Sequence, residues 1–229
     1  MSKQRIGLIH TSATLVPVFE QLCKERLPGA AVFNIVDDSL IKDVIAQNGL
    51  LPPVARRVAH HIAAAEDAGA SFIMVTCSSI GRAVETAAQL SSVPVLRVDR
   101  PLAERAVELG SRIGVIATLP TTLEPTADLI RRCAAASSRE ITLTTRLCEG
   151  AFEALMGGNA ERHDAMIREA LEQIAEDVDV IALAQASMAR VAASLPADAR
   201  RPPILSSPPL GVDRLAQWIA QSRRGEDPS

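Results

Sequence analysis

The sequence predicts an α/β protein built from two similar halves, each a parallel sheet covered by helices. Two observations predict this class. Short apolar runs alternate with longer amphipathic stretches, and the first part of the chain returns in altered form in the second part. Continuous apolar strands that alternate with helices are typical of parallel sheets covered on both faces. Two related halves that face each other would also enclose a cleft.

Eight apolar runs are predicted to be strands: residues 6–10, 31–36, 72–75, 93–98, 113–118, 141–145, 178–183 and 202–205. The stretches between them are rich in Ala, Leu, Glu and Arg. Apolar residues at helical spacing predict helices over 54–70 and 161–178. Gly69 is placed to end the first of these two helices. A last helix is expected near 209–222.

An internal duplication supports the two-half organisation. IGLIHT at 6–11 returns as IGVIAT at 113–118, an offset of 107 residues. FIMVTCSSIGR at 72–82 aligns with VIALAQASMAR at 180–190 at an offset of 108, and PVL at 94–96 aligns with PIL at 203–205. Matches that keep one order and a nearly constant offset indicate two copies of one unit. We expect the first half at 1–100, completed by the helix at 209–222, and the second at 108–208.

Composition and cysteine spacing exclude several functional classes. The net charge is −3, aromatic residues make up 2% of the chain, and no apolar stretch reaches membrane-spanning length. Neither nucleic acid nor a membrane is therefore expected as a partner, and a cytoplasmic location is expected. The four cysteines form no CxxC pair, which argues against zinc and disulfides. Phosphate-binding glycine motifs are missing, so a nucleotide cofactor is unsupported.

The loops that follow the predicted strands are the candidate ligand site, because open α/β sheets bind ligands at the carboxyl ends of their strands. Loops 10–14, 76–82, 117–122 and 184–190 are rich in Ser and Thr. Hydroxyls and free backbone N–H groups at such ends suit a carboxylate or phosphate. The candidate contacts are Thr11, Ser12, Thr76, Ser78, Ser79, Thr118, Thr121, Thr122 and Ser187. For Ser79 and Ser187, helix capping alone explains the residue type equally well.

Cys77 stands where a predicted strand gives way to a helix. The helix dipole is expected to lower the pKa of a cysteine at this point, which would make the thiolate a base or a nucleophile. Cys23 and Cys133 fall in helical stretches, and Cys148 ends an apolar run. These three cysteines are interpreted as structural.

These features resemble the aspartate/glutamate racemase superfamily, which includes hydantoin racemase, maleate isomerase and arylmalonate decarboxylase. The resemblance rests on the two α/β halves, a strand-end cysteine followed by small polar residues, and the strand IGVIAT that opens the second half. It implies a cofactor-independent enzyme that transfers a proton at the carbon next to the carboxylate of a small acid. It also implies an active site in the cleft between the halves, with Ser78 and Ser79 holding the carboxylate, and a homodimer or higher homo-oligomer.

The chain departs from the family pattern in its second half. The second cysteine of two-cysteine members stands in a motif such as LGCT or LGCAGM, whereas this chain has LAQASM with Gln185 at that position. The internal offset of 108 residues from Cys77 also leads to Gln185. Glutamine cannot relay a proton as a thiol does, but it can donate a hydrogen bond to an enolate or carboxylate oxygen. Cys77 and Gln185 are the predicted catalytic pair.

Several alternatives follow from the missing thiol. The acid of the second face could be His10, Glu149 or His163. The enzyme could instead work on one face as a decarboxylase or other lyase with a single cysteine, or Cys77 could add to an activated alkene or carbonyl. A non-catalytic sensor for small molecules is a further alternative. The pairs His60–His61 and Asp37–Asp38 are interpreted as helix-surface and helix-capping residues.

Overall fold

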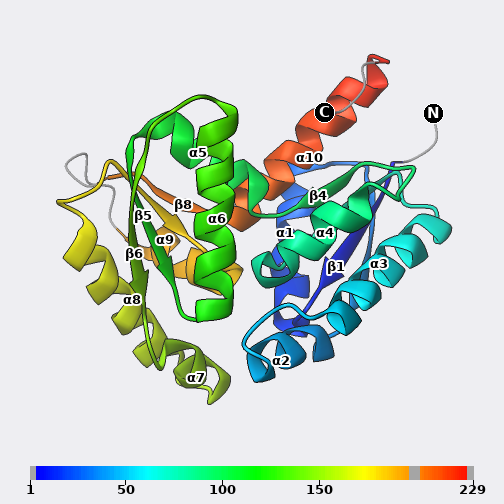
Figure 1. Cartoon of the computed structure of the whole chain (residues 1–229). Helices are drawn as coiled ribbons and strands as arrows, with labels where there is room; N and C mark the ends of the chain where they lie inside the picture. The colour runs from blue at the N-terminus through cyan, green and yellow to red at the C-terminus, as the bar shows by residue number, and fades with distance from the viewer. Residues whose placement is uncertain (1–3, 196–201, 226–229) are drawn as a thin grey trace. The chain divides into compact units, whose positions relative to one another are not determined.

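The structure is a computed structural model that describes residues 4–195 and 202–225 (Figure 1). The chain forms two compact units. Unit 1 combines Met1–Asp99 with Pro208–Ser229, and unit 2 is Arg100–Ser207. Within the described residues, no helix is long and apolar enough to cross a membrane.

Each unit contains a four-stranded, all-parallel sheet, as the sequence predicts. In unit 1 the strand order is β2-β1-β3-β4, and in unit 2 it is β6-β5-β7-β8. The two orders are the same when the second set is numbered from its own first strand. The bounds are β1 (Arg5–His10), β2 (Ala31–Val36), β3 (Phe72–Val75), β4 (Val95–Arg97), β5 (Arg112–Ala117), β6 (Thr142–Leu147), β7 (Val180–Leu183) and β8 (Ile204–Ser206). The prediction of two parallel-sheet α/β halves is confirmed.

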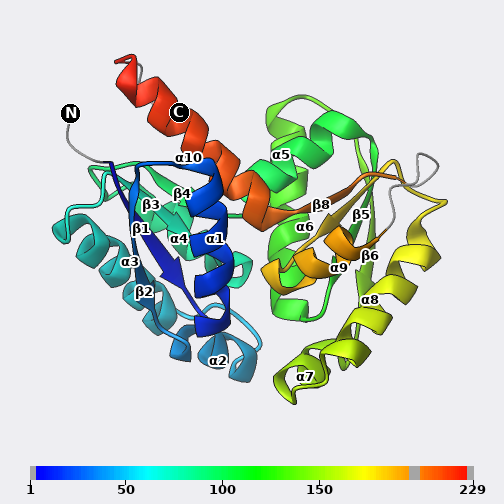
Figure 2. The ribbon, with the colours of Figure 1, turned by 180° about the vertical axis from the view of Figure 1, so that it is seen from behind.

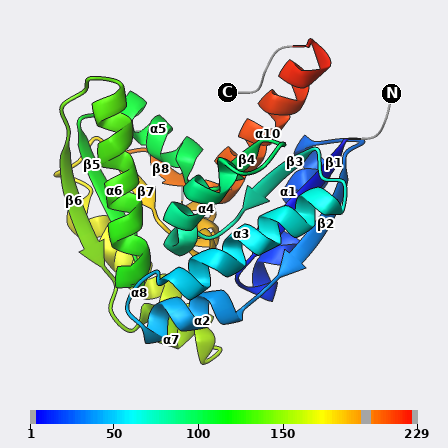
Figure 3. The ribbon, with the colours of Figure 1, turned by 45° about the vertical axis from the view of Figure 1, so that its right-hand side comes forward.

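Helices cover both faces of the sheet in unit 1. Its helical segments are η1 (Ala13–Leu15), α1 (Val16–Arg26), α2 (Ser39–Ala46), α3 (Pro52–Asp67), η2 (Ser78–Ile80), α4 (Gly81–Ala88) and α10 (Ser207–Arg223). Helices α3 and α4 run over one face (Figure 3), where Val58 and Ile62 share a core cluster with Ile73. Helix α1 lies on the other face (Figure 2). Helix α10 packs against unit 1 through Trp218, whose ring centroid is 6.5 Å from that of Phe72.

Unit 2 is covered in the same way. Its helical segments are α5 (Arg100–Leu109), α6 (Pro120–Ala136), α7 (Ala151–Met156), α8 (Ala160–Ile174), η3 (Ala186–Met188) and α9 (Ala189–Ser194). Helices α5 and α6 pack on one face of its sheet, and α8 and α9 on the other (Figures 1 and 2). Ile167 and Leu171 of α8 share a core cluster with Ile181 of β7.

Local sequence explains where several helices begin and end. Pro52 opens α3, where a missing N–H costs nothing, and Gly69 follows its end with a φ of +83°. Asn159 caps α8 by accepting a hydrogen bond from the backbone N–H of Arg162 at 3.0 Å. Because all strands of a unit are parallel, their carboxyl ends lie on one side of the sheet, which we call its carboxyl edge. The loops after β1 and β3, and those after β5 and β7, therefore lie at the carboxyl edges of their own sheets.

Candidate functional site

Cys77 lies at the carboxyl edge of the first sheet, directly after β3 and Thr76, as the N-cap residue of η2. Cys77 forms no disulfide, and the residue as a whole is half-buried. The Thr11 hydroxyl from the end of β1 hydrogen-bonds the sulfur, and so does the Ser79 hydroxyl. No regular capping hydrogen bond forms at this position, but the N–H groups of Ser79 and Ile80 interact with the sulfur. Two hydroxyls and two amides thus surround one thiol.

The protonation of Cys77 differs from the expectation that the helix end would lower its pKa. Burial raises the pKa of the Cys77 thiol above its ordinary value, and this effect is larger than the opposing hydrogen bonds. The N–H groups of Ser79 and Ile80 do favour the thiolate, as the sequence suggested, but the following 3-10 turn is short and the sulfur is largely removed from water. The resting group is therefore the neutral thiol. Its four donors would stabilise a thiolate once one forms.

Thr76 and His10 form a second polar contact behind Cys77. The Nδ1 atom of His10 lies 2.9 Å from the Thr76 hydroxyl, and its Nε2 atom lies 3.0 Å from Oδ1 of Asn34. The Asn34 amide in turn donates to Glu20 at 2.8 Å. Burial lowers the pKa of His10, although the Asn34 hydrogen bond and the Glu20 charge oppose this effect. Both ring nitrogens of this candidate acid are thus engaged in the structure.

The remaining predicted contacts of unit 1 are less closely tied to the thiol. The Ser12 hydroxyl lies 2.8 Å from that of Thr14, in the turn that leads into η1. Ser78 opens η2 and is buried. Ser12 and Ser78 therefore lie in the loops that flank Cys77, and Thr11 and Ser79 interact with its sulfur.

Gln185 occupies the matching position in unit 2. It is the N-cap residue of η3, with a backbone conformation (φ −124°, ψ 139°) close to that of Cys77 (φ −127°, ψ 119°). Its Oε1 atom accepts from the backbone N–H of Thr118 and, at 2.9 Å, from the Thr118 hydroxyl. Because a backbone N–H can only donate, the amide oxygen must face Thr118. The NH₂ group of Gln185 is left as a donor directed elsewhere.

The other predicted contacts of unit 2 fall into two groups. Thr121 and Thr122 lie in the first turn of α6, and the Thr121 hydroxyl is buried with no partner among the described residues. Ser187 lies in η3 beside Gln185 and is half-buried. Among these residues, the structure brings Thr118 and Gln185 into direct contact.

His163 and Glu149, the second-half candidates for an acid, have opposite environments. Glu149 is exposed, whereas His163 in the first turn of α8 is fully buried. The Nδ1 atom of His163 lies 2.7 Å from Asp164, and Arg190 donates to the same carboxylate at 2.7 Å. Burial raises the pKa of Asp164, but the hydrogen bonds from His163 and Arg190 outweigh it and hold the pKa low. The Nε2 atom of His163 is buried without a partner among the described residues.

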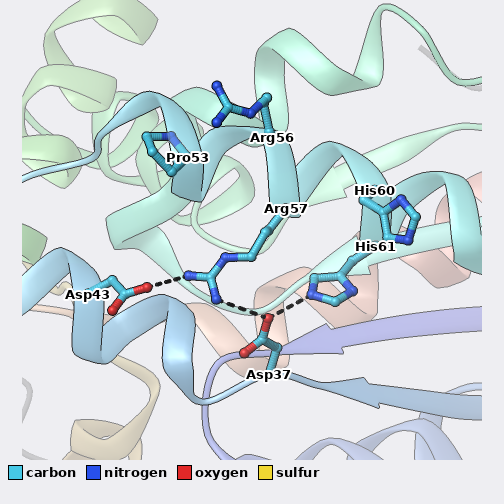
Figure 4. A pocket seen from close by; sticks show the side chains of 7 residues that line it. All are labelled: Asp37, Asp43, Pro53, Arg56, Arg57, His60 and His61. Carbon is cyan, nitrogen blue, oxygen red and sulfur yellow. Dashed lines mark hydrogen bonds and ion pairs between the residues drawn. The ribbon is translucent and has the colours of Figure 1, made fainter.

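A pocket of about 600 Å³ with several charged side chains in its lining lies between α2 and α3 (Figure 4). Asp37 accepts from His61 at 2.8 Å and from the backbone N–H of Ser39 at 3.1 Å. Arg57 bridges Asp37 and Asp43, and Figure 4 shows Arg57 and His61 turned toward Asp37. The pocket is lined by Asp37, Asp43, Pro53, Arg56, Arg57, His60 and His61. Asp37 thus binds the first turn of α2, but it also holds α3 in place, which the sequence did not suggest.

The Asp38 side chain makes no capping hydrogen bond at the N-cap of α2, contrary to the predicted capping role of the Asp37–Asp38 pair. It forms an ion pair with Lys42 one turn along the helix instead. Asp37 therefore takes the role that the sequence assigned to both residues. His60 is exposed and His61 half-buried, as expected for a helix surface.

Arg97 is a buried cation that the sequence did not single out. Its Nε and Nη2 atoms each lie 2.8 Å from the Asp99 carboxylate, and Nη1 lies 3.0 Å from Glu85. The guanidinium passes beneath Gly81, the first residue of α4. A Cβ atom on Gly81 would lie 2.3 Å from the Arg97 Cζ atom, which is closer than real contacts allow. Glycine at this position therefore makes room for the ion pairs behind the Cys77 loop.

Comparisons with known proteins agree with this architecture. An allantoin racemase from Klebsiella pneumoniae superposes with a TM-score of 0.72 at 18% identity, over 99% of this chain and 90% of that chain. A glutamate racemase from Francisella tularensis gives 0.71 at 13% identity, over 97% and 83%. A mutant of arylmalonate decarboxylase gives 0.58 at 18% identity, over 93% of each chain. At these identities the likeness concerns the fold.

The comparison with curated proteins finds no match. The family described as Asp/Glu/hydantoin racemase matches residues 6–215, which is nearly the whole chain and includes both sheets and all four strand-end loops. The chain belongs to the Asp/Glu/hydantoin racemase family.

Proposed function

We propose that the protein is a cofactor-independent racemase or isomerase that moves a proton at the carbon next to the carboxylate of a small acid. Family membership supports this class of reaction. The observation that carries the proposal is the setting of Cys77, a thiol at the carboxyl edge of a parallel sheet that contacts two hydroxyls and two amides. These donors suit a group that alternates between thiol and thiolate.

In the proposed reaction, the Cys77 thiolate removes the proton from the α-carbon, and the electron pair of the C–H bond passes into an enolate. The Thr11 and Ser79 hydroxyls stabilise the thiolate before the transfer. The Ser and Thr groups of the strand-end loops hold the substrate carboxylate, and the NH₂ group of Gln185 donates to the developing enolate oxygen. Gln185 supplies no proton, so a proton for the opposite face comes from another group or from water.

One observation supports a second candidate, a decarboxylase of the same family. Because burial raises the pKa of Cys77, the thiol is protonated at neutral pH and ready to act as an acid. In that reaction the bond to a carboxylate breaks, CO₂ leaves, and its bonding pair forms an enediolate. The Cys77 thiol then gives its proton to carbon, and the resulting thiolate regains one from water. One thiol is sufficient for this sequence.

Proton exchange in deuterated buffer tests the proposal. The protein is incubated with a panel of small amino, hydroxy and dicarboxylic acids, and loss of the α-proton signal is followed by NMR. We expect exchange with at least one acid in the wild type and exchange about 10³-fold slower in Cys77→Ser. Exchange at the wild-type rate in Cys77→Ser would contradict the role of the thiol. Binding of a panel member without exchange or CO₂ release would support the sensor alternative.

The pH dependence separates the two enzymatic candidates. Proton abstraction needs the thiolate, so its rate should rise with pH until Cys77 has titrated, above the ordinary thiol pKa of about 8.5. Protonation of an enediolate needs the thiol, so decarboxylation should be constant at neutral pH and fall as Cys77 loses its proton. A rate that is insensitive to pH between 7 and 10 would contradict proton abstraction by the thiolate, and a rate that falls with rising pH over the same range would also contradict it.

A further inference from the structure

We propose that His10 is a positioning residue for Cys77, which acts through the Thr76 hydroxyl as a neutral imidazole with its proton on Nε2. The inference deepens the proposed function and rests on it for the chemical role of the thiol. It also assigns His10 a role other than the missing acid of the second face. The four groups that carry it run in one chain from the surface to the core: Glu20, Asn34, His10 and Thr76.

The hydrogen-bond chain fixes the tautomer of His10. An ionised Glu20 carboxylate can only accept, so the NH₂ group of Asn34 must face it. The Asn34 carbonyl oxygen therefore faces His10, and the Nε2 atom of His10, 3.0 Å away, must carry a proton. In the neutral ring Nδ1 then carries no proton and accepts a hydrogen bond, and the Thr76 hydroxyl, 2.9 Å away, can donate it. The same hydroxyl lies 3.2 Å from the Ile9 carbonyl, the weaker alternative acceptor.

The His10–Thr76 contact stands directly behind the contact between Thr11 and Cys77. Each is a side-chain bridge from the carboxyl end of β1 to the carboxyl end of β3, and the two bridges are successive along both strands. The backbone N–H of Thr76 also donates to the Ile9 carbonyl at 2.9 Å. Thr76 is thus held through its main chain and its side chain one residue before the thiol. Because the backbone and side chain of Thr76 are both held, the position and orientation of the next residue, Cys77, are fixed as well.

Unit 2 provides an internal control for this assignment. The duplication relates Thr11 to Thr118 and Cys77 to Gln185, and the corresponding hydroxyl bridge is present there at 2.9 Å. The residues that correspond to His10 and Thr76 are Ala117 and Ala184, both buried. The same strand ends therefore form with two alanines in place of the His10–Thr76 side-chain bridge. The buried His10–Thr76 pair is not a requirement of the fold, and it occurs in the unit that carries the strand-end thiol.

Alkylation of Cys77 as a function of pH tests the proposal without a substrate. Iodoacetamide labels the native protein at a series of pH values, and peptide mass spectrometry separates Cys77 from the three buried thiols. His10→Leu removes both ring nitrogens. We expect the pH midpoint of Cys77 alkylation to rise by about one pH unit, which is a tenfold loss of thiolate at a given pH. The reason is that the Cys77 sulfur would no longer be aligned with the hydroxyl and N–H groups that donate hydrogen bonds to it. His10→Gln offers a donor and an acceptor and should stay close to the wild type.

A double variant guards against a simple loss of folding. His10→Ala with Thr76→Ala copies the alanine pair of unit 2, so we expect a wild-type circular dichroism spectrum together with the raised alkylation midpoint. An unchanged midpoint in both His10→Leu and the double variant would overturn the proposal. So would ¹⁵N NMR of the wild-type imidazole showing the proton on Nδ1 at neutral pH.

These outcomes are separable from those of the proposed function. If α-proton exchange keeps the wild-type rate in Cys77→Ser, the proposed reaction is wrong, while a shifted midpoint in His10→Leu still shows that His10 positions the thiol. If exchange requires Cys77 but the midpoint ignores His10, the positioning role alone is wrong.

Discussion

The two units use the same strand ends with different chemistry. At the edge of unit 1 a threonine hydroxyl meets a thiol, and at the edge of unit 2 a threonine hydroxyl meets a glutamine oxygen. The backbone at Cys77 and Gln185 is nearly superimposable in φ and ψ. The duplicated scaffold therefore fixes where the side chain stands, and the residue type alone decides whether a proton or only a hydrogen bond can be given there.

A second difference lies behind these residues. In the register of the sheets, Arg97 pairs with Val75 and Ser206 pairs with Leu183, so the buried arginine of unit 1 corresponds to a serine in unit 2. The residue above it changes in step: Gly81 stands over Arg97, and the duplication places Ala189 at the matching position. An alanine is tolerated where no guanidinium lies beneath the helix.

Together these differences teach that the strand ends of unit 1 carry buried polar groups that the fold does not need. Unit 2 forms the equivalent edge with Ala117 and Ala184. Buried polar groups cost free energy unless they are paired. In unit 1 both ring nitrogens of His10 and the Nε and Nη2 atoms of Arg97 have hydrogen-bond partners, and Nη1 of Arg97 lies in an ion pair with Glu85. We expect variants of these residues to separate stability from activity.

The largest effect on activity is expected at Cys77, where the two units differ most in chemistry because a thiol can transfer a proton and the Gln185 amide cannot. Replacement by serine keeps the size and the hydrogen bonds but removes the acid/base group. Exchange of the α-proton should fall by about 10³-fold, measured by NMR in deuterated buffer. Cys23→Ala is the matched control: burial raises the pKa of this α1 thiol to about 11, and its removal should leave exchange unchanged.

Gln185→Glu tests the contribution of the Gln185 NH₂ group alone, because it removes this donor and keeps the side-chain oxygen. A glutamate oxygen can still accept from the Thr118 N–H and hydroxyl, so the strand end should keep its structure. The donor is replaced by an anionic oxygen that repels a carboxylate. We expect turnover to fall by about 10²-fold, the usual cost of one oxyanion donor, in steady-state kinetics. Turnover equal to the wild type would show that Gln185 does not contact the substrate.

Gly81→Ala tests the space above Arg97. The new Cβ would displace a guanidinium that is paired with Asp99 and Glu85, and we expect a loss of about 2–4 kcal/mol in the free energy of unfolding. Urea denaturation measures the change. Gly49→Ala serves as the control, since its nearest atom would be 4.0 Å away. Equal stability of the two variants would refute the steric argument.

The smallest effect is expected at Asp37, which anchors α3 in unit 1. Burial raises the pKa of Asp37, but hydrogen bonds from Ser39 and His61 outweigh it and hold the pKa below the ordinary value. Its contribution to stability is therefore complete above about pH 4 and is lost as the pH falls through the lowered pKa. Asp37→Asn should cost about 1 kcal/mol at pH 7 and nothing at low pH, whereas Asp38→Asn should change little at either.

The sequence predicts the fold well because its signals are local and repeated. Every strand overlaps one of the eight predicted runs, and the offset of 108 residues leads from Cys77 to Gln185 without coordinates. The support of the site was not predictable in the same way. Asn34 reaches His10 only through the register of β1 with β2, and an arginine such as Arg97 is ordinarily exposed.

The protonation of Cys77 was mispredicted for a related reason. The end of a helix is visible in the sequence, but the removal of the sulfur from water depends on the packing of distant segments. The helix end acts in the predicted direction, and desolvation is the larger effect.

The discontinuity of unit 1 has a consequence for synthesis. Its last helix, α10, is encoded after the whole of unit 2, yet a Cβ on its Gly211 would lie 3.1 Å from the Met74 sulfur and 3.0 Å from Val98. A nascent chain that has emerged only through β8 must leave that apolar surface uncovered. The sheet of unit 1 is therefore completed only after unit 2 has been translated, and a premature stop before Ser207 would leave unit 1 without its last helix but unit 2 nearly whole.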